Sequence, residues 1–412
     1  MIGLRQGVSC SDTVLQQVKQ WLLKGLIQGI GSRVNSGYGK LKLERQAFVS
    51  LPSELRPKKR TPILQVPFEL EGQLIHGYQR VDWRQDGQSN WQPRPQAVSE
   101  VRPIAFRSML RYWFRIFALG VLPQKRVRKL EIFVFGGIEP QAQTGLFQLE
   151  IDNGDNSQSH SQAGILILHY SPFINDKIKP LIRDLLRSLT WLMFHLGGVG
   201  HGARRPYYKR IGNPQHRGVN LMPTREEITE TVRQNWILPP TPQKFQNLFQ
   251  QHLDKFYSTL RVLAKQEIDY RQPREDVIAS TAHTWVEAVD INCEILVIRK
   301  AVKEQNSRPY ALKILHDQFH DLESHDYTIA KSLCGGINKE STEEGDEIDR
   351  DVIPSPVWIA NLHKYQVVTV FGANQDPRQE YLRRLKDAID NSQNSFDSYA
   401  QIWPLHLRRA CD

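Results

Sequence analysis

Two glycine-rich segments of the 412-residue sequence carry basic and aromatic side chains at close spacing. GIGSRVNSGYGK spans 29–40 and GGVGHGARRPYYKR spans 197–210, and each follows a predicted helix. Glycines leave backbone N–H groups uncovered, arginine and lysine neutralise phosphate, and aromatic rings stack on unpaired bases. We therefore predict contact with single-stranded nucleic acid, although a glycine-rich helix end is also ordinary turn chemistry. The predicted contacts are Gly29, Gly31, Arg33, Tyr38 and Lys40 in the first segment, and Gly198, Gly200, His201, Arg204, Arg205 and Tyr207 in the second.

A third cationic pattern lies on a helix predicted over 106–119. Arg107, Arg111 and Arg115 follow i, i+4 spacing and form one stripe, whereas apolar side chains cover the other side of the helix. No acidic residue lies between Val101 and Lys129. Three like charges on one stripe repel each other, so the pattern favours an anionic partner such as phosphate. The alternative is a solvated face.

Two aspartates are candidates for catalysis. Asp82 and Asp86 lie in HGYQRVDWRQDGQSNWQPRP (76–95), which we predict to be a polar loop. Carboxylates in such a loop can bind Mg²⁺ and support attack by a ribose 2′-hydroxyl. Asp86 followed by Gly87 is also a strong turn signal, so a purely structural role is the alternative. No other cofactor or metal site is expected, because the histidines and cysteines show no ligand spacing.

The charge of the chain is uneven. Residues 1–130 hold 22 Lys and Arg against 8 Asp and Glu, whereas the remaining residues are slightly acidic within an overall net charge of +10. A basic N-terminal third predicts a face for a polyanion, which RNA, DNA or an anionic membrane surface would supply. No long apolar run is present, so no membrane span is expected. Four scattered cysteines are expected to be free thiols in a reducing cytoplasm.

The elements that must position these residues are of α+β type. Over 61–210 the pattern runs strand, loop, helix, two strands, helix and glycine-rich loop, which is compatible with a ferredoxin-like split βαβ unit. We predict strands at 62–70, 130–136, 145–151 and 164–170, and helices at 106–119 and 179–196. In the C-terminal part we predict strands within 284–299 and 352–372 and a helix at 377–390.

Four parts of the chain follow from these elements. We predict a helix, glycine-rich loop and strand over 1–50 that close a module, a complete module over 61–213, a helical connection over 214–279, and a second module over 280–412. Residues 1–45 are too short for a module of their own. They either complete the C-terminal module or dock on a neighbouring subunit.

Several phrases of the sequence together resemble one family. RPIAFRSMLRYWFRIFA, EIFVFGG, GLFQLEI and LGGVGHGARRPYY resemble the amino-terminal module of the RAMP subunit that caps the guide-tail end of type III-B CRISPR complexes. That family has an Arg-Pro, small-residue, Arg-Gly-x-x-Arg-Trp-Trp-x-Arg helix, a later Phe-Gly and a Gly-Gly-x-Gly-x-x-x-Arg-Arg loop. The match covers roughly 62–210. The chain departs from it at Ser108 and Met109, where the family tends to have Gly, and in Arg-Pro-Tyr after the loop.

The resemblance implies tandem ferredoxin-like (RRM-like) RAMP modules with antiparallel sheets. It implies a cytoplasmic protein of antiviral defence that binds guide RNA (crRNA) and other type III effector subunits, touches target RNA in some arrangements, and contacts no membrane. Arg107, Arg111, Arg115 and the loop at 197–208 would then lie against RNA or a neighbouring subunit. Subunits at the capping position are generally non-catalytic. Two enzymatic alternatives stay open: a backbone ribonuclease that cuts target RNA through Asp82 or Asp86 with Mg²⁺, and a stand-alone guide-processing endonuclease that uses His76 or His201.

Overall fold

The structure of the chain is a computed structural model. It describes residues 5–28, 62–139, 141–158, 160–209, 216–224, 236–274, 286–299, 308–319, 327–339, 350–395 and 397–404. Helices and antiparallel sheets are mixed throughout this part of the chain, which confirms the predicted α+β class.

The first sheet has four antiparallel strands in the order β10-β1-β7-β6. Along the chain, β1 is followed by a separate two-stranded hairpin and two helices, then by the hairpin of β6 and β7, then by a helix and, after short strands, by β10. The strands are β1 (Leu64–Gly72), β6 (Phe147–Gln158), β7 (Ser161–Tyr170) and β10 (Val219–Pro223). The helices are α3 (Pro103–Leu119), α4 (Gln124–Phe135) and α5 (Lys179–Leu196).

The second sheet repeats this arrangement with the order β14-β15-β11-β16. Two helices again follow the first strand, and one helix precedes the last strand. The strands are β11 (Glu294–Arg299), β14 (Val357–Leu362), β15 (Tyr365–Val370) and β16 (Ser398–Trp403). The helices are α8 (Tyr310–Phe319), α9 (Tyr327–Cys334) and α10 (Arg378–Asp390).

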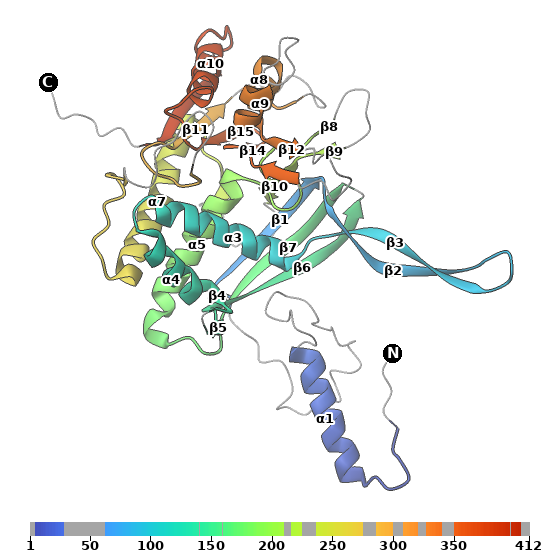
Figure 1. The fold of residues 1–412 in the computed structure, drawn as a ribbon. Helices are drawn as coiled ribbons and strands as arrows, with labels where there is room; N and C mark the ends of the chain where they lie inside the picture. Colours follow the sequence, from blue (N-terminus) through green and yellow to red (C-terminus); the bar gives the residue numbers. More distant parts are fainter. Residues whose placement is uncertain are drawn as a thin grey trace.

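The second sheet is buried on both faces. Side chains alternate across a strand, so Ile295 and Val297 of β11 join the core of the first sheet while Leu296 and Ile298 pack beneath α8 and α10. The two sheets therefore share one continuous apolar core, and α8, α9 and α10 cover its outer side (Figure 1). Helix α7 (Pro242–Ala264) packs on α5 and lies along β16.

Helix α7 also covers the backbone edge of β16. The side-chain amide of Gln246 donates to the carbonyl of Gln401 over 2.5 Å, and that of Gln243 donates to the carbonyl of Tyr399 over 3.4 Å. These bonds satisfy acceptors that an edge strand would otherwise leave open.

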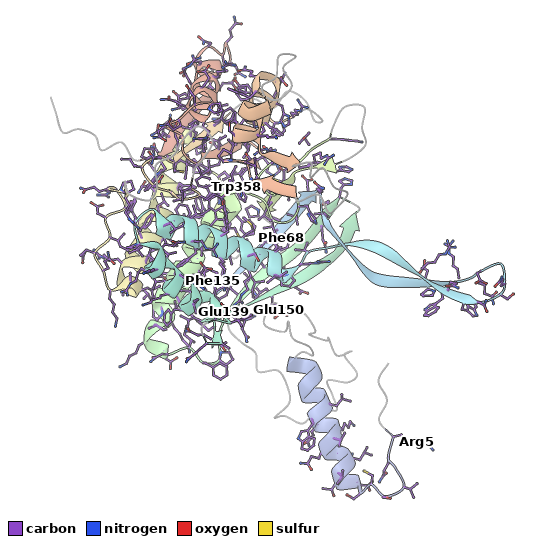
Figure 2. All side chains as sticks on the ribbon, viewed as in Figure 1. Arg5, Phe68, Phe135, Glu139, Glu150 and Trp358 are labelled. Carbon is purple, nitrogen blue, oxygen red and sulfur yellow. The ribbon has the colours of Figure 1, made fainter. Side chains whose placement is uncertain are left out.

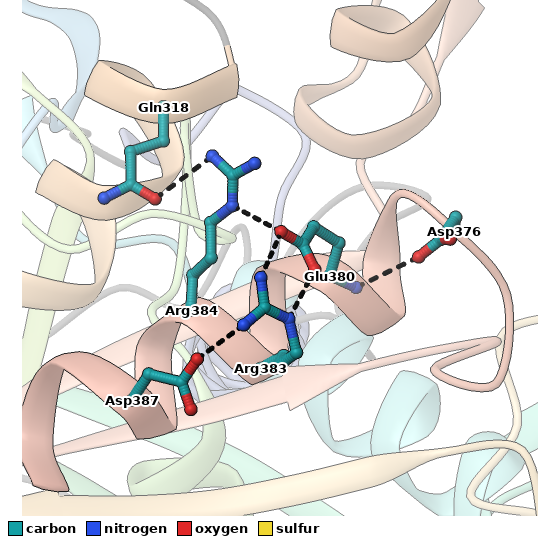
Figure 3. Close-up of polar contacts among 6 residues, drawn as sticks. All are labelled: Gln318, Asp376, Glu380, Arg383, Arg384 and Asp387. Carbon is teal, nitrogen blue, oxygen red and sulfur yellow. Dashed lines mark hydrogen bonds and ion pairs between the residues drawn. The ribbon is translucent and has the colours of Figure 1, made fainter.

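Helix α10 carries its charges as an internally paired network (Figure 3). The carboxylate of Glu380 accepts hydrogen bonds from Arg383 and Arg384 at 2.7 Å, and Arg383 also contacts Asp387 at 2.6 Å. Hydrogen bonds from the two arginines lower the pKa of Glu380 to about 2. Arg384 also reaches Gln318 of α8 at 3.4 Å. Arg383 and Arg384 are thus paired with carboxylates of the same helix, whereas Lys386 forms an ion pair with Glu294 of β11 at 2.6 Å.

Several features differ from the sequence predictions. Residues 286–291, within a predicted strand, do not form one, and α8 and α9 were not predicted. The predicted strand at 130–136 is the end of α4, because Val127, Leu130 and Val134 are buried at helical spacing. The predicted loop at 76–95 is a hairpin of β2 (Ile75–Gln85) and β3 (Trp91–Glu100). Strand β10 pairs with β1 in the first sheet, although it lies beyond the domain boundary predicted at 213. Strand β16 was not predicted at all.

The described part of the N-terminal segment stands away from both sheets. Helix α1 (Asp12–Gln28) lies apart from the body in Figure 1, and Val14, Val18 and Trp21 on it are exposed. The second sheet already has four strands without it. Residues 5–28 therefore do not complete the second sheet in this structure. Docking of 1–45 on a neighbouring subunit stays a prediction.

Two histidines are held neutral in the core beside one tryptophan. The ring of Trp191 stacks on His195 with centroids 3.9 Å apart and on His252 at 4.1 Å. Burial lowers the pKa of His195 to about 4 and that of His252 to about 3. Because both values lie below that of an unfolded histidine, the unfolded chain binds more protons at mildly acidic pH. Acid must therefore reduce the stability of the fold.

Replacing His195 with Phe should weaken this acid sensitivity. Between pH 7 and pH 5 the free energy of unfolding of the wild type should fall by about 2 kcal/mol more than that of His195→Phe, since only the wild type has this buried imidazole to protonate. Urea unfolding at the two pH values measures the difference. Equal losses of stability in both proteins would contradict it.

Candidate nucleic-acid interface

The glycine-rich loop after α5 is shaped by close packing. A Cβ atom on Gly197 would lie 2.6 Å from the ring of Trp358, which stands between the two sheets (Figure 2). Gly218 has φ +68°, and a Cβ there would lie 2.1 Å from the carbonyl oxygen of Pro206. Both positions exclude any larger residue, so these glycines bring the loop against β14 on one side and β10 on the other.

Arg204 in this loop is bound by residues in and before the second sheet. Its guanidinium donates to the carbonyl of Ser355, forms an ion pair with Glu287 at 2.6 Å and lies 5.0 Å from the centre of the Trp358 ring. Its own backbone carbonyl accepts a hydrogen bond from the N–H of Ile359 in β14 over 3.0 Å. Both the side chain and the backbone of this residue therefore join the loop to the second sheet.

Arg205 makes a similar set of contacts. Its guanidinium donates to the carbonyl of Val357 at 2.6 Å, to the carbonyl of Cys334 at 3.1 Å and to the hydroxyl of Ser355 at 2.8 Å. Burial lowers the pKa of this group. We call Arg204 and Arg205 the arginine clamp. The sequence predicted phosphate contact for both, and the structure gives both guanidinium groups protein partners instead.

The arginine stripe of α3 faces the end of α4. Arg107 donates to the carbonyl of Phe135, and Arg111 donates to the carbonyl of Gly136 over 2.5 Å. The last carbonyls of a helix lack intrahelical partners and carry partial negative charge, which suits a cation. Burial, and to a smaller extent the nearby Arg111, lower the pKa of Arg107 to about 10.

Arg115 completes the stripe with an acidic partner. Its guanidinium holds both carboxylate oxygens of Glu131, at 2.8 and 2.7 Å, and Arg111 lies 3.4 Å from the same carboxylate. Glu131 stands just beyond the acid-free stretch that suggested an unpaired stripe. That premise was wrong: the stripe packs α3 on α4, although the side chain of Arg115 keeps 49% of its surface exposed.

The two candidate catalytic aspartates do not converge. Both carboxylate oxygens of Asp86 accept bonds within the hairpin turn, from the N–H groups of Gln88 and Asn90 and from the amide of Gln92. Hydrogen bonds, chiefly from the backbone of Asn90, lower the pKa of Asp86. Asp82 lies four residues earlier in β2, a separation of about 13 Å along a strand, too far to share one ion. A shared Mg²⁺ site therefore does not fit these residues.

Other ligand clusters are also missing from the described residues, where no three His, Cys, Asp or Glu side chains group around a possible metal position. His201 is exposed in the loop, and the side chain of His76 lies outside the described residues.

The hairpin of β2 and β3, which we call the arm, projects far from the body (Figures 1 and 2). The strand register pairs Trp83 with Pro93, and Trp91 with Gln85. Because cross-strand partners share a face, both tryptophans lie on one face of the arm, where they are 60% and 63% exposed. Arg84 and Arg94 are exposed on the opposite face. Exposed tryptophans and arginines suit the bases and phosphates of a single strand.

Tyr207 contacts His216, which in turn contacts His160, and neither histidine was predicted from the sequence. Its hydroxyl lies 2.8 Å from Nδ1 of His216, and the two rings are 5.6 Å apart with planes 16° from parallel. His160 stacks on His216 at 4.7 Å with planes 7° apart. We call these three residues the ring cluster. Their separation along the chain leaves no local sequence signal.

The remaining predicted contacts, Gly29, Gly31, Arg33, Tyr38 and Lys40, lie outside the described residues. Of the second segment, Gly198 packs against Val219 and Gly200 adopts φ +106°, so both shape the turn.

Comparison with known proteins yields a distant structural likeness. No family model matches the sequence, and no curated protein matches it. Among solved structures, the chain is similar to a chain of the type III-B Cmr-beta complex bound to cognate target RNA and AMPPnP, with 10% identity and a TM-score of 0.40. The alignment covers 79% of this chain and 98% of that chain. A likeness of this degree assigns no residue a role. In the described parts of the chain, no helix combines the length and apolar composition needed to cross a bilayer.

Replacing Arg205 with Lys should destabilise the fold. One ammonium group cannot reach the acceptors on α9 and β14 together, so we expect a loss of about 2–4 kcal/mol in the free energy of unfolding. Urea unfolding measures the change, and Arg183→Lys, which alters a half-exposed arginine of α5, serves as the control. An unchanged midpoint for Arg205→Lys would rule out the clamp.

Proposed function

We propose that the chain is a guide-RNA-binding structural subunit of a type III CRISPR RNA-guided interference complex, built from tandem ferredoxin-like RAMP modules. The sequence phrases between 62 and 210 support the family. The topology supports the modules: each sheet places its last strand beside its first, followed by the third and second, with helices after the first and third strands. That is the order of a split βαβ unit.

The arm is the observation that carries the RNA-binding proposal. Trp83 and Trp91 present flat rings to solvent, and Arg84 and Arg94 lie on the other face of the same hairpin. Stacking on an aromatic ring tolerates any base, and arginine contacts the phosphate whatever the sequence. A subunit that carries many different guides needs this kind of recognition.

The arginine clamp and the arginine stripe serve the same function indirectly. Their cations hold helix ends and sheet edges in place, so they fix the body from which the arm projects. Neighbouring effector subunits are the partners that we propose for the exposed apolar face of α1. We propose no base recognition for the arginine clamp or the arginine stripe.

The first experiment is to purify the chain from its native cells and sequence the RNA that copurifies. We expect short RNAs of repeat-plus-spacer form with the wild type, and their loss with the double replacement of Trp83 and Trp91 by Ser. Phe173→Ser is the matched control, because Phe173 is 83% exposed in the turn that precedes α5 and lies neither on the arm nor on α1. RNA unrelated to repeats, or no RNA, would contradict the proposed function.

Salt dependence tests the role of the arginines on the arm. Binding of single-stranded RNA should weaken steeply with salt, since phosphate neutralisation releases counterions. Replacing Arg84 and Arg94 with Gln should reduce the slope of log K against log salt by about 0.7 for each phosphate that the variant no longer neutralises. Fluorescence anisotropy over a salt series measures the slope. The same slope in variant and wild type would exclude phosphate binding by this face.

A further inference from the structure

The ring cluster gathers three rings from separate segments at one end of the first sheet. His160 immediately precedes β7, Tyr207 precedes the short strand β8 (Tyr208–Lys209), and His216 begins β9 (His216–Arg217). The Tyr207 and His216 rings are nearly parallel and share a hydrogen bond at 2.8 Å, while His160 stacks on His216. All three residues are partly exposed.

The backbone around the ring cluster is held by the sheet. The N–H of Tyr207 donates to the side-chain oxygen of the buried Asn220 over 3.0 Å, and the carbonyl of His160 accepts from the N–H of Gly72 over 2.8 Å. Gly218, packed against Pro206, sets the turn that leads into β10. The rings are therefore positioned before any ligand arrives, which lowers the entropic cost of binding.

The surroundings of the rings are mainly cationic. Lys209 and Arg217 are exposed on the neighbouring strands β8 and β9, and the acidic Glu71 lies near enough to raise the pKa of Tyr207 beyond the effect of burial. Burial, with smaller effects of His160 and Lys209, lowers the pKa of His216. The rings thus form an aromatic surface beside the positive charges of Lys209 and Arg217.

We propose that the ring cluster is a stacking site for one unpaired nucleobase of bound RNA. The inference rests on the proposed function and extends it from the arm to the body. A phosphate would be drawn to the neighbouring cations and gains nothing from three parallel rings. A base gains from both, because its π face stacks on the rings while its own phosphate lies beside Lys209 or Arg217.

Two probes of equal charge separate stacking from phosphate contact. One is single-stranded oligoadenylate RNA of about 12 nucleotides, and the other is an abasic ribose-phosphate oligomer of the same length. With the full chain, Tyr207→Leu and His160→Ala should each weaken oligoadenylate binding about tenfold and leave abasic binding unchanged. His363→Asn, at an exposed turn between β14 and β15, is the matched control and should bind both probes as the wild type does.

Ultraviolet crosslinking of oligoadenylate to the wild type, followed by peptide mass spectrometry, should place an adduct on Tyr207, His160 or His216. Equal weakening of both probes, or of neither, would overturn the stacking site. If thermal unfolding shows that Tyr207→Leu is misfolded, the position of the crosslink in the wild type tests the stacking site instead. Adducts confined to other segments would then overturn it. If the stacking site fails these tests while RNA binding still depends on Trp83 and Trp91, the proposed function is unaffected. A wild type that binds neither probe contradicts both proposals.

Discussion

Two guanidinium groups hold the chain's two sheets in one body. Arg204 and Arg205 reach from the glycine-rich loop of the first sheet to carbonyls at Ser355, Val357 and Cys334, and the Arg204 carbonyl accepts from β14. The Trp358 ring fills the space left by Gly197. Buried arginine is costly unless every donor finds an acceptor, so this junction tolerates little change. The common core beneath both sheets depends on it.

The same pairing of charge recurs elsewhere in the molecule. Arg107 and Arg111 complete the end of α4, and the arginines of α10 are balanced by Glu380 and Asp387. Much of the positive charge that the sequence displays thus joins one element to another. The cations that we propose for RNA lie at the periphery, on the arm and around the ring cluster. A strongly basic sequence and a basic binding face are therefore different properties in this protein.

Elements that follow from local hydrophobic periodicity could be predicted from the sequence. Contacts between residues far apart in the sequence could not. The helices at 106–119 and 179–196 follow from apolar spacing, whereas the short apolar run at 130–136 suits helix or strand equally. The arm was missed because its described side chains, 82–94, are mostly exposed on both faces, so no apolar alternation marks this part as a strand. The carbonyl that binds the Arg204 side chain lies 151 positions further along the chain, beyond the reach of any local motif. His160 and His216 are likewise joined only by the folded sheet.

The second sheet has both of its outer strands covered. Along β16 the glutamine amides of α7 occupy backbone carbonyls, and along β14 the N–H of Ile359 is bound to the loop carbonyl of Arg204. Open strand edges recruit strands from other molecules and lead to aggregation. In the assembly proposed above, the chain would lie among several similar sheets at high local concentration, where this hazard is direct. Because both edges are covered, other molecules contact this sheet through side chains, which recognise specific partners. They do not contact it through backbone pairing at a strand edge, which accepts any strand.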